Sequence, residues 1–217
     1  MKFALKVYLL VFISFFPHLS FGQKTDYKAV SKSISQEYID NIAKASGSMT
    51  TLQCSFTQKK IISVLSESII SKGKLLYKKE NKLCWEYSSP YLYIFAMNGD
   101  KVFIKNEKST SQFDTKSNAV FKEISLLLVN SISGVGLIDS RKFDVAFFEN
   151  GSFIKMELTT KNKPLKSIMS TIILYFEKST YLVHNIEMVE PSGDTTSIVF
   201  SDTVLNQPID DEKFTVH

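Results

Sequence analysis

The chain has 217 residues, of which 44% are hydrophobic and 22% are charged, and its formal net charge at neutral pH is +4. This length is enough to bury a hydrophobic core without the disulfides or metal ions that much shorter domains need. The charge is too small to indicate nucleic acid as a partner.

The chain begins with the pattern of an export signal. Lys2 and Lys6 flank a basic start, an apolar run follows from Val7 to Phe16, and small residues end the segment at Gly22. We therefore expect a signal peptide over residues 1–22 and a mature chain that is exported to the periplasm. No cysteine stands near the cleavage site to carry an acyl anchor, and no later apolar run is long enough to span a membrane, so we expect a soluble protein.

Two segments have the apolar spacing of three to four residues that is typical of amphipathic helices. The first runs from Tyr27 to Ala45, and Gly47 is expected to end it. The second runs from Ala119 to Ile132, before Gly134, and is unusually apolar.

Most of the remaining chain alternates between apolar and polar residues, which predicts β-strands. The strongest turn signal is Asn98-Gly99-Asp100, because a tight hairpin turn requires backbone conformations that Asn, Gly and Asp tolerate. Short turns between successive strands predict an antiparallel meander, and strand twist makes so large a sheet curl. We expect one domain over residues 23–217, mainly β with helices (α+β). The predicted strands are Met49–Lys60, Ser68–Lys79, Leu83–Tyr87, Tyr93–Met97, Lys101–Lys105, Phe143–Glu149, Phe153–Thr160, Met169–Glu177, Tyr181–Val189 and Thr195–Val204.

The sequence contains no recognisable catalytic or metal-binding motif. His184 and His217 are the only histidines after the signal peptide, and neither lies near a nucleophile motif. Glu86 lacks a carboxylate partner and is expected on the outer face of the sheet, and Asp210-Asp211-Glu212 is interpreted as a solvated acidic turn. We therefore predict a protein that is not an enzyme and has no metal or cofactor.

The two cysteines and the lysines have structural interpretations. Strand alternation places Cys54 and Cys84 on opposite faces of the sheet, which argues against a disulfide. The lysines form a basic patch with almost no arginine beside it, and we interpret it as a solvated rim. A role in guiding encounters with an acidic partner or an anionic membrane surface stays open. The patch consists of Lys59, Lys60, Lys72, Lys74, Lys78, Lys79 and Lys82.

Large apolar side chains gather on alternate positions of the central strands. Such a face is usually an ordinary core, but a strongly curved sheet of this size has a concave side that two helices are too few to fill. That mismatch favours an apolar cavity. Its predicted lining is Phe56, Leu75, Tyr77, Leu83, Trp85, Tyr87, Phe95 and Phe103.

The sequence resembles the periplasmic outer-membrane lipoprotein carrier family, the LolA-like proteins. The resemblance extends in order over the mature chain and rests on FTQKK (56–60), GKLLYKKENKLCWEY (73–87), NGDKVFI (98–104), EISLLLVNSISG, IILYF (172–176) and VLNQPIDDEKF (204–214). It implies an unclosed antiparallel β half-barrel with a helical lid over an apolar cavity. It also implies a monomeric carrier that takes lipoprotein acyl chains from an inner-membrane ABC transporter and passes them to an outer-membrane acceptor.

Individual positions carry over from the family's pattern. Leu83, Trp85 and Tyr87 match cavity-lining positions, and Lys79 stands where some members have an arginine that latches the lid. Lysine lacks the planar fork of arginine, so the latch geometry is expected to differ. The lid helix would carry Phe121, Ile124, Leu127 and Leu128. A lipid-sensing or scaffold domain of the same fold, which transports nothing, is the alternative function.

Overall fold

The computed structural model describes residues 26–65, 67–114, 130, 132, 142–161 and 163–216. All ten predicted strands are present, with ends shifted by no more than a few residues, whereas the short elements β1, β7, α3 and η2 have no clear pattern in the sequence. In chain order the elements are β1 (Lys28–Ala29), α1 (Lys32–Ser48), β2 (Thr51–Ile62), β3 (Glu67–Lys78), β4 (Lys82–Ser89), β5 (Tyr93–Asn98), β6 (Lys101–Asn106), β7 (Thr110–Asp114), β8 (Phe143–Glu149), β9 (Phe153–Thr160), α3 (Lys163–Lys166), β10 (Thr171–Glu177), β11 (Val183–Val189), β12 (Thr195–Leu205) and η2 (Asp211–Phe214).

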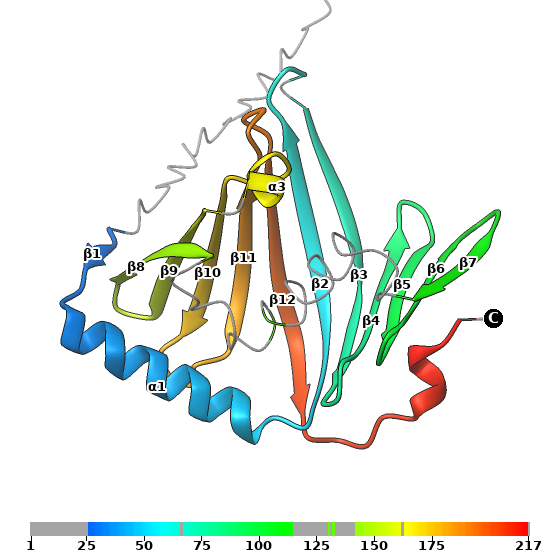
Figure 1. Cartoon of the computed structure of the whole chain (residues 1–217), viewed down its shortest axis with the longest axis horizontal. Coiled ribbons are helices and arrows are strands. Elements are labelled where there is room, and N and C mark those ends of the chain that lie inside the picture. Colours follow the sequence, from blue (N-terminus) through cyan, green and yellow to red (C-terminus); the bar gives the residue numbers. More distant parts are fainter. Residues whose placement is uncertain are drawn as a thin grey trace, which may run out of the picture.

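The described strands form one antiparallel sheet in the order β1-β8-β9-β10-β11-β12-β2-β3-β4-β5-β6-β7. Neighbours in this order are mostly consecutive in sequence, as the meander pattern predicts. There are two exceptions. β1 pairs with β8, and β12 pairs with β2, which brings Phe200 opposite Phe56 and joins the two halves of the chain. The sheet is strongly curved and does not close, because β1 and β7 remain as its two edges (Figure 1).

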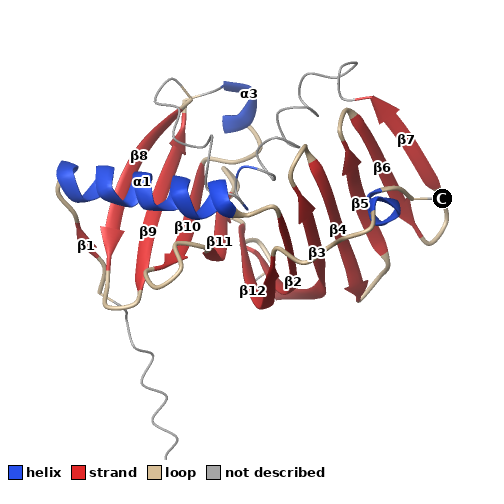
Figure 2. Cartoon of the chain, turned by 90° about the horizontal axis from the view of Figure 1, so that it is seen from below, coloured by secondary structure: helices blue, strands red, loops and turns tan. Residues whose placement is uncertain are grey.

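Helix α1 covers part of the concave side of the sheet. Ser31 caps its N-terminus by accepting a hydrogen bond from the Ile34 N–H at 3.4 Å. The helix was predicted from Tyr27, but Lys28–Ala29 form β1 and the helix begins at Lys32. It continues through Gly47, which has no positive φ and does not end it as the sequence predicted. Seen from below, α1 runs across β8, β9, β10 and β11 (Figure 2). No helix in the described part of the chain is long and apolar enough to span a membrane.

The concave side, called the inner face below, carries the larger hydrophobic cluster. Strand register aligns its residues in rows, because Leu174 lies opposite both Met156 and Ile186. All three side chains are buried, and α1 contributes Tyr38 and Ile42 to the same cluster. The inner face is therefore the main core, and α1 is part of its cover.

The convex side, called the outer face below, has a smaller cluster beneath the C-terminal segment. Phe214 of η2 is fully buried there against Cys84, Ala96 and Phe103. Asp211 accepts hydrogen bonds from Lys78 Nζ and Lys82 Nζ, both at 2.6 Å.

These two lysines hold the pKa of the Asp211 carboxyl below its ordinary value. Asp210, Asp211 and Glu212 are exposed, as the sequence predicted, but Asp211 also fastens the C-terminal segment to the sheet through its two lysines.

The two cysteines lie on opposite faces, as strand alternation predicts. Cys54 belongs to the inner cluster and Cys84 to the outer one, and both thiols are free. Burial raises the pKa of Cys54 to about 12, with a smaller contribution from Asp202, and it raises the pKa of Cys84 to about 11. Both thiols are therefore protonated at neutral pH and poorly reactive.

Replacing Phe214 with alanine should remove the centre of the outer cluster. We expect Phe214→Ala to lower the free energy of unfolding by about 3–5 kcal/mol, because it deletes a fully buried aromatic side chain. Lys213→Ala, which changes an exposed neighbour, should leave it nearly unchanged. Urea titration followed by Trp85 emission measures both, and equal midpoints for the two variants would contradict the assigned role of η2.

Candidate functional site

Seven of the eight predicted cavity residues come together on the inner face. The register places Leu75 opposite Trp85 and Trp85 opposite Phe95, so a row of large side chains crosses three strands. Trp85 is only 4% exposed. The group consists of Phe56, Leu75, Tyr77, Leu83, Trp85, Tyr87 and Phe95.

Phe103 is the exception, and its predicted place in the cavity is wrong. The hairpin turn at Gly99-Asp100 pairs Asn98 with Lys101, which sets Phe103 opposite Ala96 and Ile104 opposite Phe95. Since opposed residues share a face, Phe103 points to the outer cluster and Ile104 takes the inner position. The turn predicted at Asn98-Gly99-Asp100 fixes this register. Counting residue pairs outward from that turn therefore gives the correct face for Phe103.

The aromatic rings on the inner face contact one another around Trp85. The Phe56 ring lies 5.0 Å from the Trp85 ring and 5.1 Å from the Tyr87 ring, measured between centroids. Phe200, which the sequence analysis did not select, lies 6.2 Å from Trp85 and extends the cluster to β12. Phe200 was missed because the pairing of β12 with β2 joins segments far apart in the chain.

Gly73 makes room for this cluster. A Cβ atom at Gly73 would lie 1.9 Å from the carbonyl oxygen of Glu86 and 2.6 Å from Cζ of Phe56. The Phe56 ring therefore rests against the backbone of β3, where any side chain would displace it. Gly73 lies in neither a turn nor a helix cap. A glycine is needed at this position because the neighbouring atoms pack too closely for any side chain.

Two polar groups lie within the aromatic cluster. The Tyr87 hydroxyl donates a hydrogen bond to Gln58 Oε1 at 2.8 Å, and burial raises the pKa of Tyr87. Trp85 Nε1 is buried, and no acceptor lies within hydrogen-bonding geometry of it among the described residues. Trp85 nevertheless lies close enough to the Tyr87 hydroxyl to lower the pKa of Tyr87, against the larger effect of burial.

Helix α1 packs on the inner face through Tyr38 and Ile42, which are both buried. Ile132, from the segment predicted as the second helix, is also buried in this cluster. The predicted lid residues Phe121, Ile124, Leu127 and Leu128 lie outside the described residues.

A polar network fastens the middle of α1 to the sheet. Glu149 Oε2 accepts one hydrogen bond from the Tyr38 hydroxyl and another from Lys178 Nζ, both at 2.5 Å. Lys178, and then Tyr38, lower the pKa of the Glu149 carboxyl. Burial, and then Glu149, raise the pKa of Tyr38. The network is half-buried, so solvent and ionic strength reach it.

Lys79 fastens the C-terminal end of the same helix. Its Nζ donates to the carbonyl oxygen of Gly47 at 2.5 Å, where a cation also interacts favourably with the helix dipole. The sequence predicted Lys79 as a latch for the second helix. The contact that the structure describes is instead with α1.

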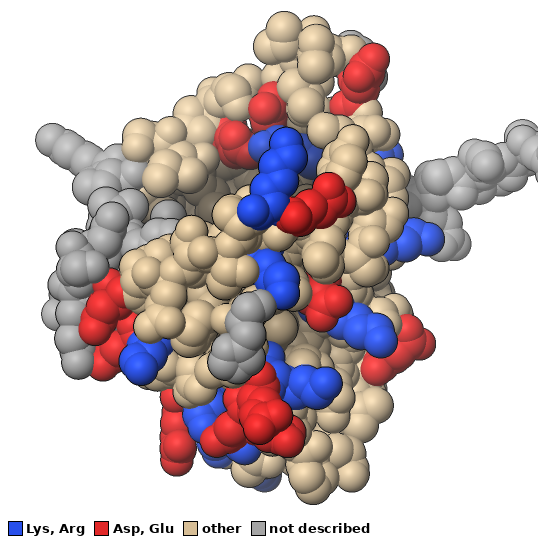
Figure 3. Space-filling model, turned by 90° about the vertical axis from the view of Figure 1, so that its right-hand side faces the viewer, with Lys and Arg blue, Asp and Glu red and all other residues tan. Residues whose placement is uncertain are grey.

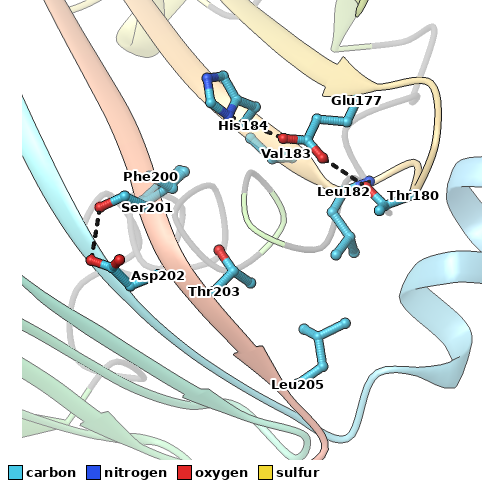
Figure 4. Close-up of a pocket in the computed structure, with 10 residues that line it drawn as sticks. All are labelled: Glu177, Thr180, Leu182, Val183, His184, Phe200, Ser201, Asp202, Thr203 and Leu205. Atoms are coloured by element: carbon cyan, nitrogen blue, oxygen red, sulfur yellow. Dashed lines mark hydrogen bonds and ion pairs between the residues drawn. The ribbon is translucent and has the colours of Figure 1, made fainter. Parts of the chain in front are cut away.

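An opening separates β11 from the lower part of β12. The ladder between these strands ends at Asn185 and Val199, so β12 continues beyond it without a partner on that side. A cavity of about 480 Å³ lies in this opening. Figure 4 shows residues of the β10–β11 turn on one side of it and residues of β12 on the other. Its lining is Glu177, Thr180, Leu182, Val183, His184, Phe200, Ser201, Asp202, Thr203 and Leu205.

The cavity extends from the inner face, because Val183, Phe200 and Leu205 also belong to the inner cluster. The rim is polar, and His184 Nδ1 lies 3.3 Å from Glu177 Oε1. His184 occupies a β-bulge opposite β10 and not the ordinary strand position that the sequence predicted. No metal-binding group of histidines, cysteines and carboxylates occurs among the described residues.

Comparisons with known proteins agree on one family. The family model for "Outer membrane lipoprotein carrier protein LolA" matches residues 47–217. The chain is 24% identical over 169 residues to the outer-membrane lipoprotein carrier protein of Pseudomonas putida (strain GB-1), with 76% of each chain covered. It is 26% identical over 146 residues to that of Pseudomonas aeruginosa (strain UCBPP-PA14), which covers 66% of this chain and 65% of the relative.

A solved structure has a similar fold. An uncharacterized conserved protein from Thermus thermophilus superposes with a TM-score of 0.50 over 85% of this chain and 94% of that chain, at 8% sequence identity. A likeness at this identity concerns the fold alone.

Substituting Gly73 tests the packing of the aromatic cluster. We expect Gly73→Ala to lower the free energy of unfolding by at least about 1–3 kcal/mol, because its Cβ would overlap the Glu86 carbonyl oxygen and the Phe56 ring. Gly151→Ala is the matched control, since nothing lies within 4 Å of the added Cβ there. Thermal unfolding measures both, and a Gly73→Ala variant as stable as the control would disprove the close packing.

The network at Glu149 predicts a pH dependence. Because the folded state lowers the pKa of Glu149, its stabilising contribution is complete above about pH 4.3, the ordinary value, and is lost as the pH falls through the lowered value. Wild-type α1 should therefore lose protection from hydrogen exchange, corrected for the intrinsic rate, in that acidic range. Glu149→Gln should weaken protection of α1 at neutral pH and lack this acidic step.

Glu107→Gln, at an exposed position in the β6–β7 turn, is the matched control and should behave as the wild type. An acidic step of unchanged size in Glu149→Gln would mean that another group is responsible.

Proposed function

Because the chain belongs to the LolA family of outer membrane lipoprotein carriers, we propose that it binds lipoprotein acyl chains on its inner face and carries them from the inner to the outer membrane. This family consists of binding proteins and not of enzymes. The observation that carries the proposal is the continuous apolar inner face, which runs from Phe147 on β8 to Phe95 on β5. α1 covers the part of it nearest β8 and is bonded through Tyr38 and at Gly47.

The driving force for loading is the hydrophobic effect. Each methylene group removed from water contributes about 0.8 kcal/mol, so an acyl chain in the periplasm strongly favours any apolar surface that can enclose it. The cavity of about 480 Å³ beside Phe200 lies within the size range of small-molecule sites. We propose that an acyl chain begins there and extends toward Trp85 as the cover moves aside.

Helix α1 acts as a lid in this mechanism, together with the apolar segment 119–132. In the empty protein Tyr38 and Ile42 occupy the inner face, so the lid's own side chains compete with the cargo. Loading then requires only that the cargo contacts outweigh those of the lid, and release at the acceptor restores the closed state without nucleotide hydrolysis. Lys79 and the Tyr38–Glu149–Lys178 network set how readily the lid leaves.

The polar groups in the aromatic cluster suit the head of a lipid anchor. Acyl chains are joined to such an anchor through ester and amide carbonyl groups, which accept hydrogen bonds. Trp85 Nε1 is the buried donor that lacks an acceptor among the described residues. We propose that it donates to a carbonyl of the cargo, which would fix the depth of the anchor in the hollow.

Membership of this family also suggests where the protein would act in the cell. An N-terminal export signal over residues 1–22 would deliver the chain to the periplasm, where it would take its cargo from an inner-membrane ABC transporter. An outer-membrane acceptor would receive that cargo.

A charged side chain in the cavity should block loading. We expect Val183→Glu, on the cavity wall, to abolish release of lipoproteins from spheroplasts, because an acyl chain cannot be buried against an unpaired carboxylate. Val199→Glu is the matched control, since Val199 is exposed on the outer face of β12 and should retain release. Circular dichroism establishes that both variants fold.

Two outcomes would contradict the proposal. Normal release by Val183→Glu would show that the inner face is not the cargo site. Wild-type protein that binds acyl chains but never delivers them to outer-membrane vesicles would favour the lipid-sensing alternative over transport.

A further inference from the structure

The β2–β3 hairpin has an apolar tip that projects beyond the neighbouring strands. Val64 is 86% exposed and Leu65 is 59% exposed at the turn. The tip stands highest among the described elements in Figure 1, and Figure 3 shows mostly uncharged atoms, with some acidic side chains beside them, at the same end of the molecule. The tip also includes the exposed residues Ile61, Ile69 and Ile70.

The tip is held in place by the adjoining β11–β12 turn. Asp194 Oδ1 accepts hydrogen bonds from the backbone N–H and the hydroxyl of Ser63, both at 2.9 Å. Lys60 Nζ lies 2.9 Å from Glu190 Oε1 at the end of β11. These contacts fix Lys60 and Ser63, which precede Val64 and Leu65 in the hairpin, against the neighbouring turn.

Some lysines of the basic patch are paired with described carboxylates or carbonyl groups, and others are not. Lys78 and Lys82 are paired with Asp211, Lys60 is paired with Glu190, and Lys79 is bonded to Gly47. Lys74 lies directly opposite Glu86 on the outer face.

Lys59 and Lys72 have no carboxylate within ion-pair distance in the part of the chain that the structure describes. Both lie on the outer face of the hairpin, since Lys59 is opposite Ile70 and Lys72 is opposite Thr57. Glu67 is the one acidic residue described between them along the hairpin. The hairpin therefore joins an apolar tip to free positive charge.

We propose that the β2–β3 hairpin docks on an anionic phospholipid bilayer, with its apolar tip among the acyl chains and with Lys59 and Lys72 against the headgroups. An apolar end backed by lysines is the pattern of interfacial membrane binding. Val64 and Leu65 lie in the turn beyond Ile62, the last residue of β2, so they are the part of the hairpin that would enter the bilayer interface, which such segments reach to about 5–10 Å.

The arrangement of the isoleucines favours a bilayer over a protein groove. Ile61 and Ile70 lie on the outer face of the hairpin, whereas Ile69 lies opposite Lys60 on the other face. A groove in a protein would bury one face of the hairpin, but a bilayer surrounds an inserted tip on every side. This contact goes beyond cargo binding, because it would bring the inner face close to the membrane at the moment of transfer.

Vesicle binding tests the proposal. Protein purified after export is sedimented with vesicles of equal parts phosphatidylglycerol and phosphatidylethanolamine, and the double variant Val64→Ser/Leu65→Ser should bind about tenfold or more weakly than the wild type. The double variant Lys59→Gln/Lys72→Gln should lose binding to these vesicles and lose less on phosphatidylcholine vesicles. Val204→Ser is the control, because Val204 is exposed at the opposite end of β12 and should have no effect.

A second readout places the tip directly. In Leu65→Trp the added indole should shift its emission to shorter wavelength with vesicles, relative to the wild-type background from Trp85. Absence of wild-type binding, equal binding by Val64→Ser/Leu65→Ser, or an unshifted emission would overturn the proposal, as would a tip that instead mediates self-association or binds a protein.

Acyl-chain binding by Val64→Ser/Leu65→Ser should stay at the wild-type level, which separates this proposal from the carrier function. If that binding is lost as well, the hairpin belongs to the cargo site and the docking proposal fails.

Discussion

The fold depends on how one curved sheet covers its inner apolar face. Twist makes a sheet of this many strands curl, and curling creates a concave side whose centre its own side chains fill. Phe56 can lie flat there because Gly73 has no side chain, and Trp85 then packs against it. α1 supplies part of the remaining cover and is bonded at Tyr38 and near Gly47. The proposed carrier function requires that this cover give way to a ligand.

The two faces of the sheet are held by similar kinds of contact. On the outer face, Phe214 is fully buried and Asp211 binds lysines from two strands, so the C-terminal segment stabilises the sheet where no ligand is needed. On the inner face, α1 buries Tyr38 and Ile42 and is bonded through Glu149, which also binds Lys178. Apolar burial and a charged network therefore act together on both sides of the same strands.

Much of this architecture can be read from the sequence, because alternation and turn residues act locally. Strand positions, the opposite faces of Cys54 and Cys84, and the grouping around Trp85 follow from a period of two. Features that depend on contacts between distant segments do not follow from it. The pairing of β12 with β2, which adds Phe200 to the site, is one of them. The pairing of Asp211 with Lys78 and Lys82 is another, because it joins residues more than a hundred positions apart.

The proposed carrier function requires that cargo acyl chains reach the aromatic cluster around Trp85. Trp85 is the single tryptophan of the chain, so its emission reports on that place alone. A lipopeptide with brominated acyl chains quenches indole fluorescence only on contact. Such a lipopeptide should quench Trp85 strongly, and an unbrominated lipopeptide should compete the quenching away. Saturable binding of the brominated lipopeptide with unchanged Trp85 emission would contradict this placement of the cargo.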